Sequence, residues 1–140
     1  MKTTFKILAT LGLVLLGQMP LQAQNKTQQK MNYVVLSKNM QQLNPILITA
    51  DALAEADGMK YGKMEVVICG KTVQDIKDSP ELSKLISEAQ DLHVKINVCG
   101  LSLKKFGVDP NSLPSGLNVV DNGIFYSFQL QKKGYMSLTI

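Results

Sequence analysis

The sequence predicts a single domain with the architecture of a three-layer α/β sandwich. Short apolar strands alternate with amphipathic helices five times along the chain. The segments between them are short, and parallel strands with short connections must be joined through crossover helices. We therefore expect a parallel sheet that is covered by helices on both faces.

The first half of the chain carries two strand patterns and two clear helix starts. Residues 33–36 (YVVL) are apolar on both faces, which is typical of a central strand in a covered sheet. Asn44 with Pro45, and later Ser79 with Pro80, combine an N-cap residue with a first-turn proline. The elements expected here are strands over residues 33–36 and 64–68, helices over 44–57 and 79–91, and a helical turn over 72–77.

The second half begins with a strand whose apolar residues alternate with polar ones over residues 94–99. The last predicted helix directs Ile124, Phe125 and Phe128 toward the core, and Gly134 ends it. The elements expected here are strands over residues 94–99, 117–120 and 135–140 and helices over 101–106 and 123–133, with a proline-containing loop over 109–116.

The first residues have the layout of a secretory signal peptide. Lys2 and Lys6 flank a basic start, an apolar run covers residues 7–16, and a small residue precedes a cleavage point between Ala23 and Gln24. The run is too short to span a bilayer. We expect a periplasmic or secreted protein without a membrane span after cleavage. Its predicted organisation is a signal peptide over 1–23, a flexible leader over 24–31 and one domain over 32–140.

The charge and composition argue against nucleic-acid and membrane-surface partners. The net charge of the 140 residues is +4, and removing Lys2 and Lys6 with the signal peptide lowers it to +2. The chain contains no arginine, on which bidentate recognition of phosphate and guanine depends. No run of lysines is longer than two residues, so no polybasic membrane-binding patch is present.

The two cysteines are the main candidates for chemistry. Cys69 and Cys99 each end an apolar strand and each precede a glycine. An exported chain favours a disulfide, but the positions are equally compatible with a redox pair or with one reactive thiol beside a structural one. If the two strands are neighbours, the sulfurs come within bridging range.

Cys99 has the more favourable position of the two. It lies at the carboxyl end of a strand, where ligands collect in open α/β sheets, and just before a helix N-terminus, which lowers the pKa of a thiol. This predicts an accessible, nucleophilic thiolate that holds or passes sulfur or exchanges disulfides. The alternative is a small buried hydrophobic residue.

Other chemistry has little support in this sequence. His93, the one histidine, precedes the same strand, so we expect it at the opposite sheet edge as a solvated loop residue. No spacing of metal ligands, no serine triad and no phosphate-binding loop is present, and we expect neither a metal nor a cofactor. Lys104 and Lys105 fit a solvated helix face or an anion contact, and Asn97 fits a pocket or a subunit contact.

Several short motifs, in order, resemble the DsrE/DsrF-like (YchN-like) sulfur-relay family. The likeness covers most of residues 33–140. The motifs that carry it are Val66 to Gly70 (VVICG), Val98 to Gly100 (VCG), Gly107 to Asp109 (GVD), Gly116 to Val120 (GLNVV), Gly123, Leu130 with Gln131, and Gly134 with Tyr135.

The resemblance implies a flavodoxin-like α/β/α sandwich with a five-stranded parallel sheet of order 4-3-2-1-5. That order makes the strands of Cys69 and Cys99 neighbours. The resemblance also implies a homo-oligomer, either a trimer or a hexamer, and a protein that donates or accepts the sulfur. The position of Cys99 is similar to that of the family cysteine that carries a persulfide, with Cys69 as its possible redox partner.

Two functional hypotheses follow from the sequence. In the first, the protein is a persulfide carrier or sulfurtransferase that binds or transfers sulfane sulfur on Cys99. In the second, it is a non-catalytic oligomeric binding module or a thiol/disulfide redox protein, with Cys69 and Cys99 structural or paired. Both require the same fold.

Overall fold

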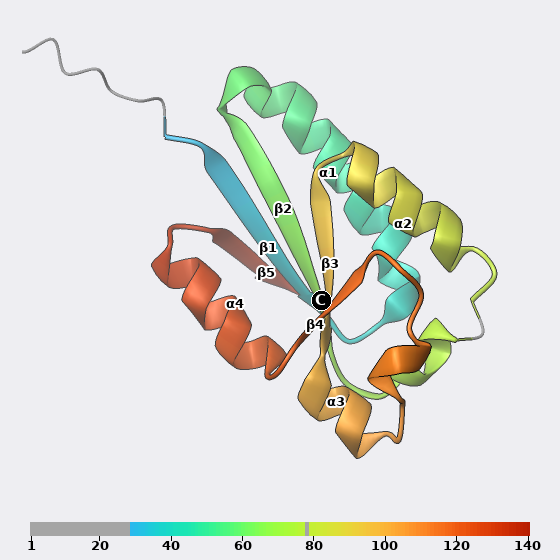
Figure 1. Cartoon of the computed structure of the whole chain (residues 1–140). Coiled ribbons are helices and arrows are strands. Elements are labelled where there is room, and N and C mark those ends of the chain that lie inside the picture. Colours follow the sequence, from blue (N-terminus) through green and yellow to red (C-terminus); the bar gives the residue numbers. More distant parts are fainter. Residues whose placement is uncertain (1–28, 78) are drawn as a thin grey trace, which may run out of the picture.

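The computed structural model describes residues 29–77 and 79–140 and contains a five-stranded, fully parallel sheet in these residues (Figure 1). The strand order is β4-β3-β2-β1-β5, which confirms the predicted order and the predicted fold class. The apolar strands β1, β2 and β3 occupy the middle of the sheet. The strands are β1 (Met31–Ser37), β2 (Tyr61–Ile68), β3 (Val94–Cys99), β4 (Leu117–Val120) and β5 (Met136–Thr139).

Helices cover both faces of the sheet and give three layers (Figure 1). The helices α1 (Leu43–Asp57) and α2 (Leu82–Asp91) pack side by side on one face. The other face is covered by α4 (Gly123–Lys132), and the short helix α3 (Gly100–Lys105) continues directly from the carboxyl end of β3. In residues 29–77 and 79–140 the connections also contain the 3-10 helices η1 (Met40–Gln42), η2 (Gly58–Lys60), η3 (Lys71–Ile76) and η4 (Pro110–Ser112).

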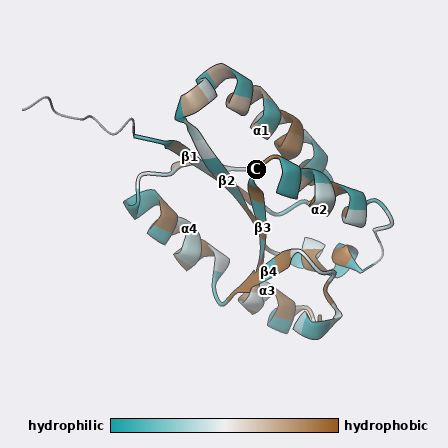
Figure 2. Cartoon of the chain, turned by 45° about the horizontal axis from the view of Figure 1, so that its top comes forward, coloured by the Kyte–Doolittle hydropathy of each residue, from teal (hydrophilic) through white to brown (hydrophobic). Residues whose placement is uncertain are grey.

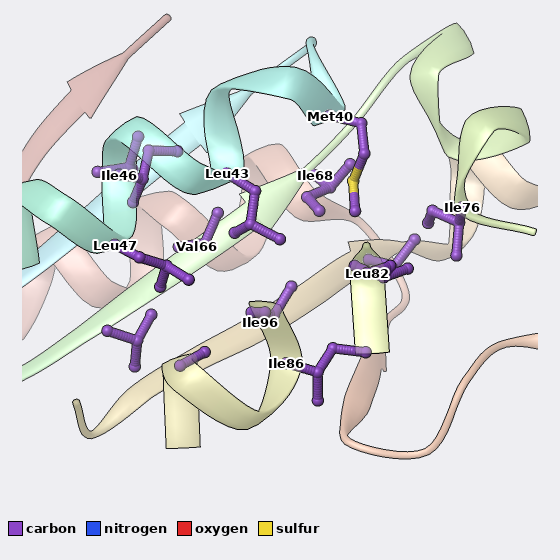
Figure 3. Close-up of a cluster of buried hydrophobic side chains, with 14 of the residues drawn as sticks. Met40, Leu43, Ile46, Leu47, Val66, Ile68, Ile76, Leu82, Ile86 and Ile96 are labelled. Carbon is purple, nitrogen blue, oxygen red and sulfur yellow. The ribbon is translucent and has the colours of Figure 1, made fainter. Parts of the chain in front are cut away.

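The larger hydrophobic core lies between the sheet and the pair α1 and α2. Leu43, Ile46 and Leu47 of α1 meet Leu82 and Ile86 of α2 over the apolar side chains of β2 and β3 (Figure 3). On the α4 face, a smaller core includes the two cysteines; its buried members are Val34, Val67, Cys69, Cys99, Leu130 and Tyr135. The sulfur atoms therefore belong to the face that a single helix covers.

The predicted orientation of α4 is wrong. Ile124, Phe125 and Phe128 do not face the core but are 58%, 61% and 56% exposed (the residue colours along α4 can be followed in Figure 2). The buried side of the helix is formed by Gly123, Ser127 and Leu130. These residues follow an i, i+4, i+7 pattern just as a large apolar stripe would, and the small size of Gly123 and Ser127 lets the helix approach the sheet closely.

Some predicted boundaries are also displaced. β1 begins at Met31, inside the predicted leader, and β2 begins three residues before the predicted start. Neither Asn44 nor Ser79 is an N-cap, because α1 follows directly from η1 at Leu43 and α2 begins at Leu82. The predicted signal peptide and most of the predicted leader lie outside the described residues.

Candidate functional site

Cys99 lies where β3 ends and α3 begins, as the sequence predicts. The residue is the N-cap of α3, and Gly100 is the first residue of that helix. Its side chain, however, is only 4% exposed, so the prediction of an accessible sulfur is wrong for the single chain. The first turn of α4 covers it, and the backbone N–H of Gly123 donates a hydrogen bond to Cys99 Sγ at 3.3 Å.

The connection between β4 and α4 brings this second helix N-terminus to the sulfur. β4 pairs with β3, and the last pair of the ladder is Cys99 with Val120. The backbone N–H of Leu101 donates to the Asp121 carbonyl at 3.0 Å, which ties the start of α3 to the end of β4. The Asn122 side chain caps the N–H groups of Ile124 and Phe125. The remaining first-turn donor, that of Gly123, points to the sulfur.

Gly123 has no room for a side chain. A Cβ atom at this position would lie 2.5 Å from Cys69 Sγ, 2.8 Å from Val67 Cγ1 and 3.1 Å from Cys99 Cβ. Carbon and sulfur atoms that are not bonded do not approach a carbon atom that closely without repulsion. Glycine is therefore required here for the helix to reach both cysteines.

Cys69 is the neighbour of Cys99 across two adjacent strands. β2 and β3 pair in register up to Ile68 with Val98, and the residue that follows each of these two is a cysteine. The backbone N–H of Cys69 donates to the Ser37 carbonyl at 2.9 Å, and its side chain is 6% exposed. Both thiols are free and both face α4. The structure thus brings together the two cysteines that the sequence singles out.

The two thiols have opposite electrostatic environments. For Cys99, burial alone would raise the pKa, but hydrogen bonds from Ser102, Gly123 and Cys69 outweigh it and the pKa lies below the ordinary value. For Cys69, burial and then the charge and hydrogen bond of Cys99 raise the pKa to about 12, and Lys38 opposes this only weakly. Cys99 therefore loses its proton at lower pH than Cys69 does, which favours a Cys99 thiolate beside a protonated Cys69.

Ser102 is a residue of the candidate site that sequence reasoning missed. It lies three residues after Cys99, on the same side of α3 as the sulfur. Its Oγ accepts the backbone N–H of Gly70 at 2.8 Å, which leaves its own hydroxyl hydrogen to donate to Cys99. The serine three residues after an N-cap cysteine is the signal that could have identified it.

The other residues considered from the sequence lie away from the sulfur or have their hydrogen bonds with other residues. Lys104 and Lys105 are exposed in the last turn of α3. His93 is exposed and adopts a positive φ of 56° at the end of α2, at the opposite edge of the sheet, as predicted. Asn97 lines neither a pocket nor a surface, because it is fully buried and donates to Glu65 Oε2 at 3.0 Å.

Glu65 is a buried carboxylate on the same sheet face as the cysteines. The Tyr126 hydroxyl of α4 donates to Glu65 Oε2 at 2.5 Å, beside the donor from Asn97. Lys63 Nζ lies 3.9 Å from Glu65 Oε1. These partners stabilise the buried charge and fix α4 over the sheet, because a buried carboxylate without donors is strongly destabilising.

Comparison with known proteins agrees with this fold. The model of the DsrE/DsrF-like family matches residues 23–139, which is most of the chain. The protein belongs to the DsrE/DsrF-like family. Membership suggests a role in sulfur relay in general terms, and members are usually oligomeric. No curated protein matches the chain.

Two solved structures of DsrE/DsrF-like fold resemble this chain. A protein of unknown function from Methanobacterium thermoautotrophicum is 22% identical, with a TM-score of 0.63, over 79% of this chain and 99% of its own. A conserved protein of unknown function from Bacteroides thetaiotaomicron is 20% identical, with a TM-score of 0.57, over 78% of this chain and 94% of its own. At these identities the likeness establishes the fold alone. Within the described part of the chain, none of the helices has the length and apolar character needed to cross a bilayer.

Proposed function

We propose that this protein carries sulfane sulfur as a persulfide on Cys99. The observation that carries the proposal is the set of hydrogen-bond donors to Cys99 Sγ. These donors are the backbone N–H of Gly123 at 3.3 Å and the side chains of Ser102 and Cys69. Sulfur transfer needs a thiolate, and hydrogen bonds to the charged form favour the thiolate. Membership of a family with a general role in sulfur relay supports the same chemistry.

The transfer is a thiol exchange in two steps. The Cys99 thiolate attacks the outer sulfur of a donor persulfide, a new bond forms to Cys99 Sγ, and the donor leaves as its own thiolate. An acceptor thiolate then attacks the outer sulfur on Cys99 and restores the Cys99 thiolate. No net oxidation occurs in either step, and donors to Cys99 Sγ assist the second step by stabilising the leaving thiolate.

A homo-oligomer, either a trimer or a hexamer, is part of this proposal. Ile124 and Phe125 directly follow Gly123, and together with Phe128 they expose a continuous apolar face of α4. Leu138, 58% exposed on the edge strand β5, borders a groove against α4. Exposed apolar surface of this kind is typical of subunit contacts. We infer that a second copy of the chain covers this face, next to the turn that encloses the sulfur.

The compartment and the partners of the transfer are likewise proposals. The signal-peptide pattern of residues 1–23 supports a periplasmic or secreted protein. In such a compartment the sulfur donor or acceptor is another exported protein or a small persulfide. Because Cys99 is buried, a partner has to displace the first turn of α4 before the sulfurs can meet.

Sulfur loading tests the proposal directly. The Cys69→Ser variant is treated with inorganic polysulfide and its intact mass is measured without reductant. We expect a gain of one sulfur atom per chain, located on the peptide that contains Cys99. The matched control is the double variant Cys69→Ser/Cys99→Ser, which should gain nothing. Equal loading of the two variants, or none in either, would refute the assignment.

The burial of both thiols favours one alternative, a non-catalytic oligomeric binding module with structural cysteines. Cys69 and Cys99 are 6% and 4% exposed, as expected of inert core thiols. Under this alternative neither cysteine accepts sulfur, and both react with alkylating reagents only as fast as the chain unfolds. The loading experiment therefore separates the two functions.

A further inference from the structure

The second cysteine has no role in simple persulfide transfer, yet the fold places it against the first. Cys69 and Cys99 follow the last paired residues of β2 and β3, and neighbouring strands are about 4.8 Å apart. Disulfides span Cα separations of roughly 4.4–6.8 Å. Cys69 Sγ and Cys99 Cβ also lie 2.5 Å and 3.1 Å from the same point, the position of a Cβ on Gly123.

We propose that Cys69 is a resolving thiol, which converts the Cys99 persulfide into a Cys69–Cys99 disulfide and releases the carried sulfur as hydrosulfide. This inference rests on the proposed function, because it requires the persulfide. It extends that function from carrying sulfane sulfur to reducing it. The substrates are small or protein-bound persulfides and polysulfides.

The reaction is balanced within the loaded protein. Cys69 Sγ attacks Cys99 Sγ, the inner sulfur of the persulfide, and a bond forms between the two cysteine sulfurs. The bond from Cys99 Sγ to the outer sulfur breaks, and the outer sulfur leaves with the electron pair and the proton of Cys69. The outer sulfur is reduced to hydrosulfide while the two cysteine sulfurs are oxidised to a disulfide. A dithiol reductant must supply two electrons to restore the free thiols.

Two features of the site favour this outcome over release to a free thiol. The chain contains only two cysteines, and both are nearly sealed under α4, so the nearest nucleophile to a Cys99 persulfide is Cys69. An attack within one site also gains the advantage of proximity over a bimolecular attack.

Because Cys69 is protonated in the unloaded protein, it does not act as a second thiolate that attacks an incoming sulfur donor. In the unloaded protein, burial and then the neighbouring Cys99 charge raise its pKa to about 12. Cys69 therefore donates a hydrogen bond to the Cys99 thiolate and does not compete with it for an incoming donor. After loading, the negative charge moves to the outer sulfur, which departs with the Cys69 proton.

Two readouts on polysulfide-treated protein test the inference. The wild-type chain, Cys69→Ser and Cys99→Ser are treated with limiting inorganic polysulfide, and intact mass and trapped hydrosulfide are followed over time. Serine at position 69 keeps a hydroxyl donor for Cys99 but cannot form a disulfide. Cys69→Ala, which lacks that donor, serves as the second variant in case Cys69→Ser does not fold.

For wild type we expect the loss of two hydrogen atoms, a Cys69–Cys99 linked peptide and one hydrosulfide per chain beyond the shorter polysulfide or hydrosulfide that leaves when Cys99 is loaded. For Cys69→Ser we expect a retained sulfur atom, and we expect the hydrosulfide release that follows loading to be slowed by at least about tenfold. If wild type keeps the added sulfur, or if Cys69→Ser releases hydrosulfide as fast as wild type, the resolving role is overturned while the carrier function stands. If Cys69→Ser never gains sulfur, the proposed function fails and this inference with it.

Discussion

The backbone N–H of Gly123 donates a hydrogen bond to Sγ of Cys99, and the two residues begin α4 and end β3, respectively. This contact gives the sulfur a second helix N-terminus in addition to that of α3. Both N-termini contribute partial positive charge at the place where a thiolate would form. The contact also explains why the sulfur is buried, because the first turn of α4 both supplies the donor and covers the sulfur.

Replacing Gly123 by alanine should destabilise the protein by about 1–2 kcal/mol. Overpacking typically costs about 1–3 kcal/mol, against a gain of at most about 1 kcal/mol when a helical glycine becomes alanine. The added Cβ would lie 2.5 Å from Cys69 Sγ, so α4 must move outward. Urea unfolding measures the change. The exposed control Lys132→Ala, at the other end of α4, should stay within about 0.5 kcal/mol of wild type.

Replacing Ser102 by alanine should raise the pKa of Cys99. The variant removes a hydroxyl that donates to the Cys99 sulfur and leaves the Gly70 N–H without its acceptor. We expect the pH midpoint of Cys99 alkylation to move upward and the stability to fall by about 1 kcal/mol. Ser112→Ala in η4, exposed and away from the sulfur, is the matched control. An unchanged midpoint in Ser102→Ala would contradict the role of this hydroxyl.

The stability of the protein should fall in alkaline solution partly because of Cys69. Its pKa is raised from 9.0 to about 12 in the folded chain, so the folded state keeps a proton that the unfolded state releases. The resulting stabilisation is fully present below pH 9.0 and is lost as the pH rises toward about 12. Tyr33, whose burial also raises its pKa to about 12, adds a similar loss. Urea unfolding at several alkaline pH values should show a smaller slope for Cys69→Ala than for wild type, and equal slopes would contradict the assignment.

A charge on the exposed apolar face of α4 should weaken the proposed homo-oligomer. Phe125→Glu places a carboxylate in the centre of the apolar face that Ile124, Phe125 and Phe128 form on α4. Burial of this charge against a second copy would be costly. Analytical ultracentrifugation should then show a lower molecular mass than for wild type. Met59→Glu, on an 83% exposed side chain of η2, controls for the added charge and should leave the mass unchanged. If wild type is a monomer, this surface does not hold a second copy.

The sequence predicted the framework of the fold because that framework depends on local patterns. Apolar runs identified all five strands, and the motifs shared with the family supplied the order that makes the Cys69 and Cys99 strands neighbours. The position of Cys99 between β3 and α3 followed from a strand pattern that ends at a glycine. The strand positions and the position of Cys99 require no knowledge of contacts between distant segments, whereas the strand order came from the family motifs.

The parts that were missed depend on such contacts. Gly123 reaches Cys99 only because β4 pairs with β3, and no local pattern around residue 123 indicates a cysteine partner. For the same reason the sequence could not show which side of α4 faces the sheet, the side with Phe125 and Phe128 or the side with Ser127 and Leu130. The close approach of Gly123 turns Ser127 and Leu130 inward and leaves Phe125 and Phe128 exposed.

Titration of the thiols in the native protein tests most directly whether Cys99 is held as a thiolate. The ultraviolet absorbance of the thiolate is followed against pH for wild type and for Cys99→Ser, and the difference between the two curves reports Cys99. We predict a midpoint below the ordinary value of 9.0, with Cys69 still protonated in that range. A midpoint at or above 9.0 would show that burial outweighs the donors from Gly123 and Ser102, and would contradict the account of this site.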